Sequence, residues 1–241
     1  TLLFCILLFP AIQSLALGET AYIHQRQDTG DLILSDSNHQ AMIYVDDQDY
    51  SGVLRAVRNL QLDISKVTSR LSAIVHDSRN LQGDAIIIGT LGHSRLIDQL
   101  VADGKLDVSA TQERWDGFLL QIIEEPVAGV ERALIIVGAD KRGSIYGTYD
   151  LSEAIGVSPW YWWADVPVKK REALYIAADT FKQQAPAVRY RGIFLNDEAP
   201  ALSNWVREKF GNYNADFYEH VFELLLRLKA NFMWPAMWNN A

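Results

Sequence analysis

The sequence predicts an α/β protein in two parts, an α/β layer domain followed by the start of a second strand–helix series. From about Ala41, short apolar runs alternate with stretches in which apolar residues recur at helical spacing. Around residues 181–186 the chain becomes polar and reaches Pro186, and the pattern resumes beyond it. We therefore expect an N-terminal α/β domain over residues 18–184 and a second part over residues 185–241.

The first part begins with a strand over residues 41–45, and Asp49 is expected to cap the helix that follows. One face of that helix carries Val53, Ala56, Val57 and Leu60. The later elements are a buried strand over residues 85–88 ended by Gly89, a helix over 94–100, strands over 118–123 and 133–137, and a helix after Asp140 closed by Gly156.

The second part contains a strand over residues 188–195, a long loop, a helix over 215–229 and a strand over 230–234. The helix carries a continuous apolar stripe, which suits a helix that covers a parallel sheet. This is one βα unit and the start of the next. Two strands are too few to close a barrel.

The first twelve residues are uncharged and apolar, and Ser14 and Ala16 place small residues three and one positions before a possible cleavage point. This pattern predicts a partial signal peptide over residues 1–17. The run is too short to cross a bilayer, so we expect a secreted, extracellular protein without membrane association after cleavage. The single cysteine, Cys5, lies in this segment, so the mature chain is expected to have no disulfide.

Charge and motif spacing exclude several classes of function. A net charge of −8 disfavours a nucleic-acid partner, because phosphate binding needs a basic face. The five histidines lack metal-ligand spacing. The turn at residues 138–143 is glycine-rich but lacks the spacing of a phosphate loop. Lys141 and Arg142 are assigned to domain packing or solvent, with carboxylate binding as the alternative.

An acidic segment follows the first strand of the second part. Asn196, Asp197 and Glu198 come directly after the apolar run that ends at Leu195, where barrel enzymes place reactive groups. Glycosidic cleavage needs one protonated carboxyl group and one ionised carboxylate. Adjacent residues on a loop usually diverge, so the second carboxylate is expected from another strand. The alternative is that this segment only begins a polar loop.

The tryptophans are unevenly distributed, and five of the seven lie in residues 160–163 and 234–238. Such rings either fill a domain interface or bind the apolar faces of sugars. We expect interface packing for residues 160–163 as a group. In an extended segment, Trp160 and Trp162 would face one way and Tyr161 and Trp163 the other. The candidate sugar-binding residues are Trp163, Asp165, Trp205 and Trp238.

Four segments closely resemble glycoside hydrolase family 115, namely residues 138–152, 157–167, 190–198 and 231–238. The resemblance runs from about Ala41 to the end of the sequence. It implies that the α/β domain precedes a TIM-type barrel, of which this sequence holds the first βα unit and the second strand. It also implies further domains in a longer parent chain.

The resemblance further implies an inverting xylan α-1,2-glucuronidase that releases glucuronic acid or its 4-O-methyl form without a cofactor. The partner would be glucuronoxylan or an oligosaccharide from it. In the family, the acidic loop after the first barrel strand lies in the active-site pocket, which implies contacts from Asn196, Asp197 and Glu198. Inversion places two carboxyl groups roughly 6.5–9.5 Å apart, so they come from different strands. The later strands are absent from this sequence, and we expect it to be inactive alone.

Two other classes of function remain open from the residues. The aromatic clusters could belong to a carbohydrate-binding or docking module, or to an inactive remnant, in which no bond is broken. The layers and glycine turns also suggest a nucleotide-binding domain, but that reading requires a phosphate loop that the sequence lacks.

Overall fold

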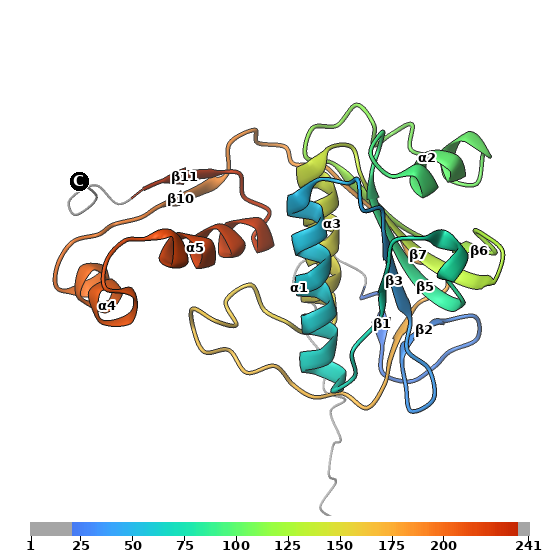
Figure 1. The fold of residues 1–241 in the computed structure, drawn as a ribbon, viewed down its shortest axis with the longest axis horizontal. Coiled ribbons are helices and arrows are strands. Elements are labelled where there is room, and N and C mark those ends of the chain that lie inside the picture. Colours follow the sequence, from blue (N-terminus) through green and yellow to red (C-terminus); the bar gives the residue numbers. More distant parts are fainter. Residues whose placement is uncertain (1–20, 236–241) are drawn as a thin grey trace, which may run out of the picture.

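The computed structural model describes residues 21–235, and Figure 1 shows the arrangement of their helices and strands. A six-stranded sheet in the order β4-β3-β5-β7-β6-β9 forms the centre of the N-terminal domain. Its strands, in chain order, are β3 (Met42–Val45), β4 (Ile74–Val75), β5 (Gly83–Thr90), β6 (Phe118–Glu124), β7 (Val130–Gly138) and β9 (Phe181–Gln184).

The sheet is parallel at one side and antiparallel at the other. Strands β4, β3, β5 and β7 are parallel, whereas β6 pairs antiparallel with both β7 and β9. Helices cover both faces of the parallel side, so β5 and β7 are buried on both faces and read as continuous apolar runs.

Three helices cover the sheet, and each face has its own hydrophobic core (Figure 1). Helices α1 (Ser51–Thr68) and α3 (Lys141–Ala154) pack on the face that presents Ile86 and Ile136. Helix α2 (Arg95–Ala102) packs on the opposite face, which presents Ile87 and Ile135. Successive residues of a strand point to opposite faces, which explains this division.

A smaller antiparallel sheet in the order β1-β8-β2 completes the N-terminal domain. Its strands are β1 (Ile23–His24), β2 (Leu32–Ser35) and β8 (Leu174–Ile176), and a short 3₁₀ helix, η1 (Ser78–Asn80), precedes β5. Within residues 21–235, no helix combines the length and apolar character needed to span a membrane.

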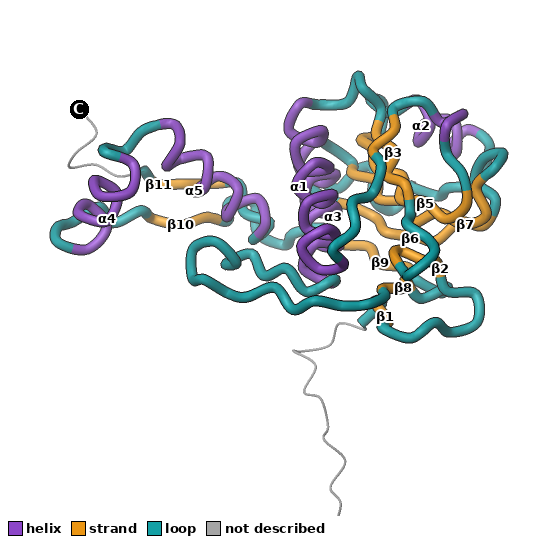
Figure 2. Tube along the Cα trace, turned by 60° about the horizontal axis from the view of Figure 1, so that its bottom comes forward, coloured by secondary structure: helices purple, strands orange, loops and turns teal. Residues whose placement is uncertain are grey.

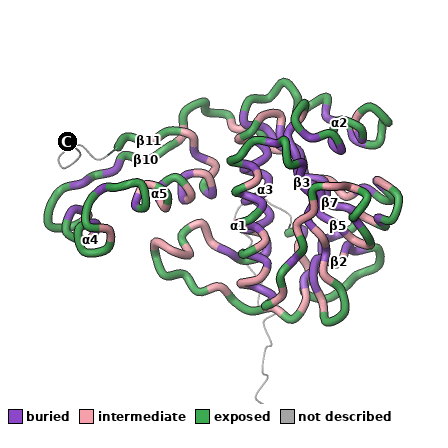
Figure 3. The backbone as a smooth tube through the Cα atoms, viewed as in Figure 1, coloured by how far each residue is buried: buried purple, intermediate pink, exposed green. Residues whose placement is uncertain are grey.

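The second part consists of β10 (Gly192–Phe194), α4 (Ala201–Phe210), α5 (Ala215–Arg227) and β11 (Phe232–Trp234). The strands β10 and β11 pair in parallel, as a βα unit requires. One face of this pair belongs to a hydrophobic cluster with α4 and α5, which includes Leu195, Val206 and Phe217. The other face is exposed at Phe194 and Trp234, and Figure 3 shows both strands as largely exposed.

The structure confirms a mixed α/β fold and corrects several details of the sequence prediction. Asp49 does not cap α1, because its carboxylate accepts hydrogen bonds from the backbone nitrogens of Tyr50 and Thr90, and Tyr50 precedes the first helical residue. Gly89 lies inside β5 rather than ending it. The long loop after residue 195 contains α4, a helix that the sequence analysis did not predict.

The polar segment before Pro186 contains a strand of the central sheet. Residues 181–184 form β9, the edge strand that pairs with β6. An edge strand buries little of its surface, so it tolerates polar side chains, and both Phe181 and Gln183 are exposed. The sheet of the N-terminal domain therefore ends at Gln184.

Candidate active site

The acidic segment lies at the carboxyl ends of the parallel pair β10 and β11. Asn196, Asp197 and Glu198 leave β10 just after Leu195, whose backbone nitrogen donates to the carbonyl of Trp234 at 2.9 Å. Because the two strands are parallel, residues that follow β11 leave from the same edge as this acidic loop, defined as residues 196–198. This is the edge at which α/β enzymes assemble their sites.

The two acids of the loop occupy different environments. Asp197 is buried, with 1% of its surface exposed, whereas Asn196 and Glu198 are exposed. The Asn196 side-chain oxygen accepts a hydrogen bond from the backbone nitrogen of Glu198 at 3.3 Å. The loop thus presents one carboxylate inward and one to solvent, as expected for neighbouring residues that diverge.

Two residues that the sequence analysis did not single out lie beside Asp197. The Ser203 hydroxyl, in the first turn of α4, donates to the Asp197 backbone carbonyl. Tyr213, between α4 and α5, is buried. Burial raises the pKa of the Tyr213 phenol, and the negative charge of Asp197 acts in the same direction. Sequence spacing does not identify Ser203 or Tyr213, because both lie near Asp197 only when residues 201–210 fold as α4.

The aromatic residues after α3 pack between the two parts of the chain. Residues 159–163 form turns rather than an extended segment, so the expected alternation of side chains does not occur. Trp162 and Trp163 instead contact the same group of rings from α4 and α5. Tyr161 packs against the core of the N-terminal domain. Interface packing, as expected for this group, is what the contacts show.

The remaining candidate residues are divided between packing and solvent. Trp163 and Trp205 are half-buried, with ring centroids 5.7 Å apart. Asp165 is exposed and has a left-handed backbone conformation with φ of 48°. Trp238 and the predicted signal peptide at residues 1–17, including Cys5, lie outside the described residues.

At the opposite ends of β10 and β11, Asp116 joins the second part to the N-terminal domain. Its carboxylate accepts hydrogen bonds from Arg142 Nε at 2.6 Å, Arg191 Nη2 at 3.0 Å and Asn231 Nδ2 at 2.9 Å. Arg191 and Asn231 directly precede the two strands. Arg142 therefore serves domain packing by binding a carboxylate of its own chain.

The glycine-rich turn at residues 138–143 is not an anion site in this structure. The Asp140 carboxylate occupies the amino terminus of α3, where it accepts hydrogen bonds from the backbone nitrogens of Arg142 and Gly143 at 2.9 Å. Any side chain at Gly143 would collide with the Gly117 carbonyl. The glycines therefore permit close packing of α3.

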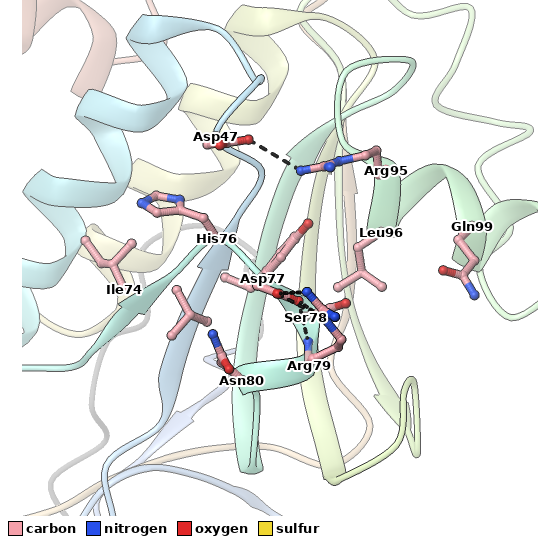
Figure 4. A pocket seen from close by; sticks show the side chains of 12 residues that line it. Asp47, Ile74, His76, Asp77, Ser78, Arg79, Asn80, Arg95, Leu96 and Gln99 are labelled. Carbon is pink, nitrogen blue, oxygen red and sulfur yellow. Dashed lines mark hydrogen bonds and ion pairs between the residues drawn. The ribbon is translucent and has the colours of Figure 1, made fainter.

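A pocket of about 740 Å³ lies elsewhere, between β4, η1 and α2 (Figure 4). Its two arginines are paired, Arg79 with Asp77 and Arg95 with Asp46 and Asp47. Burial opposes ionisation of Asp46, but hydrogen bonds from Arg95 outweigh it and lower the Asp46 pKa to about 2. Because both arginines of this pocket are already paired with aspartates, neither is free to bind an anionic ligand. Across residues 21–235, no cluster of three His, Cys, Asp or Glu side chains is placed to hold a metal ion.

Comparison with known proteins relates this chain to enzymes that act on carbohydrates. The sequence profile of glycosyl hydrolase family 115 matches residues 183–241, which include the acidic loop. The solved structure of a family GH115 4-O-methyl-α-glucuronidase, with specificity for decorated arabinogalactans, matches with a TM-score of 0.72 and 33% sequence identity. The match covers 86% of this chain and 26% of that protein, so this chain spans about a quarter of its length.

More distant matches have lower scores. A Streptomyces plicatus N-acetyl-β-hexosaminidase matches with a TM-score of 0.47 and 11% identity, over 85% of this chain and 31% of that one. The protein CpGH84D matches with a TM-score of 0.47 and 12% identity, over 88% and 35%. No curated protein matches significantly. From its profile match and its similarity to a solved family member, the chain belongs to glycoside hydrolase family 115.

Proposed function

We propose that this chain is the amino-terminal part of a secreted glycoside hydrolase that releases glucuronic acid, or its 4-O-methyl form, from side chains of xylan. The observation that carries the proposal is the acidic loop, which lies within the region matched by the family profile and at the carboxyl end of β10. The matched glucuronidase acts on decorated arabinogalactans, so both polysaccharides belong in the test.

In this proposal, β10, α5 and β11 begin a TIM-type barrel, and the acidic loop forms one wall of its pocket. Asp197 and Glu198 are the candidate catalytic acids of this part of the chain. One is buried and the other exposed, which supports a second carboxylate on another strand. Inversion would require a separation of roughly 6.5–9.5 Å between the two carboxyl groups, with water between them.

The polar and aromatic candidates have supporting roles. Asn196 and Asp165 are exposed and could bind sugar hydroxyl groups. Trp238 follows β11, whose carboxyl end lies beside that of β10, so its ring is a candidate sugar platform. Trp163 and Trp205 each have part of their surface accessible and are candidates for the rim. No cofactor takes part in this reaction.

The test uses the full-length enzyme with Asp197→Asn and Glu198→Gln, assayed for uronic acid release from glucuronoxylan and from a glucuronidated arabinogalactan. A fall on the order of 10²-fold or more in either variant would support a role in proton transfer or substrate positioning. Near-normal rates in both would remove the acidic loop from the mechanism. Polysaccharide binding without release by the unaltered protein would instead support a carbohydrate-binding module.

Secretion is a separate part of the proposal and has its own test. The apolar run before Ser14 and Ala16 supports cleavage near Gly18. Amino-terminal sequencing of protein recovered from the culture medium should give a start near that residue. A protein that retains residues 1–17 and stays with the cells would contradict it.

A further inference from the structure

The loop after α3 connects the core of the N-terminal domain to the helix that follows the acidic loop. We call residues 157–168 the aromatic arm. Figures 1 and 2 show this loop extending from the base of α3 toward α5. Val157 and Val168, its two ends, pack with the core of the N-terminal domain. The arm is therefore anchored at both ends in a different part of the protein from the acidic loop.

The middle of the arm is fixed to α5 and α1 by Tyr161. Its hydroxyl donates to Glu223 Oε1 at 3.1 Å. The Lys66 ammonium lies 4.1 Å from the centre of its ring, and the Arg227 guanidinium 5.0 Å from it on α5. Cation–π contacts at this range are attractive and favour one ring position. Tyr161 therefore fixes the position at which the tip of the arm, Trp162 and Trp163, begins.

The tip of the arm packs on α4 and α5 through two tryptophans. Trp162 stacks on His220 with ring centroids 3.8 Å apart and an interplanar angle of 8°. Trp163 lies 5.7 Å from Trp205 of α4 and 6.1 Å from Phe217 of α5. Its indole nitrogen donates to the His220 carbonyl at 3.3 Å. The arm thus contacts both helices at once.

Helix α4 in turn restrains the acidic loop. Ser203 donates to the Asp197 carbonyl, and only two residues separate Glu198 from the first residue of α4. Val206 of α4 lies in one hydrophobic cluster with Leu195, the residue just before the loop. A displacement of α4 would therefore move Asp197 and Glu198 with it.

From these contacts we propose that Trp163, together with Trp162, is a positioning residue. It anchors Trp205 and α4 to the N-terminal domain and thereby fixes the position of the acidic loop. The exchange test below is independent of the proposed function, whereas the kinetic test rests on it. In this role, Trp163 affects the position of Asp197 and Glu198 without contacting the sugar.

The structural test compares Trp163→Ala with Trp160→Ala by hydrogen–deuterium exchange of the 241-residue chain. Trp160 belongs to the same arm, but its side chain is 43% exposed and makes no ring contact within residues 21–235, so it is the matched control. We expect faster exchange of residues 196–210 in Trp163→Ala alone, with β5 and β7 unchanged in both variants. Unchanged exchange of residues 196–210 in a folded Trp163→Ala protein would overturn the proposal.

A milder variant keeps the test decisive if Trp163→Ala does not fold. Trp163→Phe retains a ring against Trp205 but removes the hydrogen bond to the His220 carbonyl. In Trp163→Phe, exchange of residues 196–210 should then be faster than in the unaltered chain. Exchange equal to that of the unaltered chain in both Trp163→Phe and Trp162→Phe would also overturn the proposal.

The kinetic test uses the full-length enzyme on glucuronoxylan. A positioning role predicts that Trp163→Ala lowers kcat by roughly 10- to 100-fold with little change in KM, since small displacements of reacting groups have effects of this size. Trp163→Phe should recover part of the loss. A raised KM with unchanged kcat and unchanged exchange would mean that Trp163 contacts the sugar instead. If the unaltered enzyme releases no uronic acid, the proposed function fails while the exchange result still decides the role of the arm.

Discussion

At the scale of single residues, Asp116 determines how the second part attaches. It is buried, and its carboxylate accepts hydrogen bonds from α3, from the residue before β10 and from the residue before β11. Its backbone is left-handed, with φ of 56°. Aspartate and asparagine tolerate this conformation better than most residues, so the position suits an acid that must point inward from a turn.

Replacing Asp116 by asparagine should destabilise the chain by roughly 2–3 kcal/mol, because two partly buried arginines lose their carboxylate while the backbone conformation remains permitted. Urea unfolding at neutral pH measures this change. Asp165→Asn is the matched control, since Asp165 is also left-handed but exposed, and we expect a change within about 0.5 kcal/mol. Equal stability of the two variants would contradict the role assigned to Asp116.

At the residue scale, the sequence indicates where the acidic loop lies, but not which side chains surround it. The acidic loop could be located because Asp197 and Glu198 come directly after an apolar run. Asp116 could not be found in this way, because its partners lie 26, 75 and 115 residues away and only folding brings them together. Ser203 is near Asp197 in sequence, but its contact depends on α4, a helix that the sequence analysis did not predict.

At the scale of elements, α1 and α5 are joined by one buried and one exposed ion pair. Arg227 Nη1 lies 2.7 Å from Asp63 Oδ2, and both side chains are almost fully buried. Burial by itself lowers the pKa of Arg227, but the charges of Asp63 and Glu223 outweigh it and raise the pKa. Arg55 and Glu219 form the second pair between the same helices, with about half of each side chain exposed.

We expect Arg227→Met to destabilise the chain by roughly 2–4 kcal/mol, because the buried Asp63 carboxylate would keep only the partly exposed Lys66, 3.0 Å away, to balance its charge. Arg55→Ala should cost less than about 1 kcal/mol, since solvent screens the exposed pair. Chemical denaturation of both variants gives the comparison. If Arg227→Met cost no more than Arg55→Ala, the buried pair would not be what holds α5 to α1.

Elements with strong periodicity were predictable, and weakly patterned ones were not. Helix α1 and strands β5 and β7 carry clear apolar patterns and lie where expected. Helix α4 buries only Ser203 and Val206, so its short sequence carries too little periodic signal to separate it from a loop. Strand β9 is polar because it lies at an edge, and its pairing with β6 depends on tertiary structure.

At the scale of the whole molecule, the two parts share contacts just beyond the carboxyl end of α5. Tyr146 of α3 donates to the Ala230 carbonyl at 3.0 Å, and Lys229 lies 2.7 Å from Asp150. Together with the pairs at Asp116 and Arg227, these contacts make separate unfolding of either part costly. The order of the two parts was predictable from the sequence, whereas their attachment was not.

We therefore predict that the two parts of the chain unfold in a single cooperative transition. Circular dichroism reports the sheet and helices of both parts, and tryptophan fluorescence includes three tryptophans of the aromatic arm out of seven in the chain. The two methods should give coincident denaturation curves. The double variant Asp116→Asn with Arg227→Met should separate the two curves. Non-coincident curves in the unaltered chain would show that the parts unfold independently.

The ion pair of Asp116 also bears on how such enzymes can be dissected. The segment at residues 185–190 is the obvious place to cut, because Gln184 ends the sheet and β10 has not begun. A piece expressed from Ala185 onward would leave behind the carboxylate that binds Arg191 and Asn231, and also the tryptophans that pack on α4. Poor yield of such a piece would then reflect the loss of Asp116 and the aromatic arm.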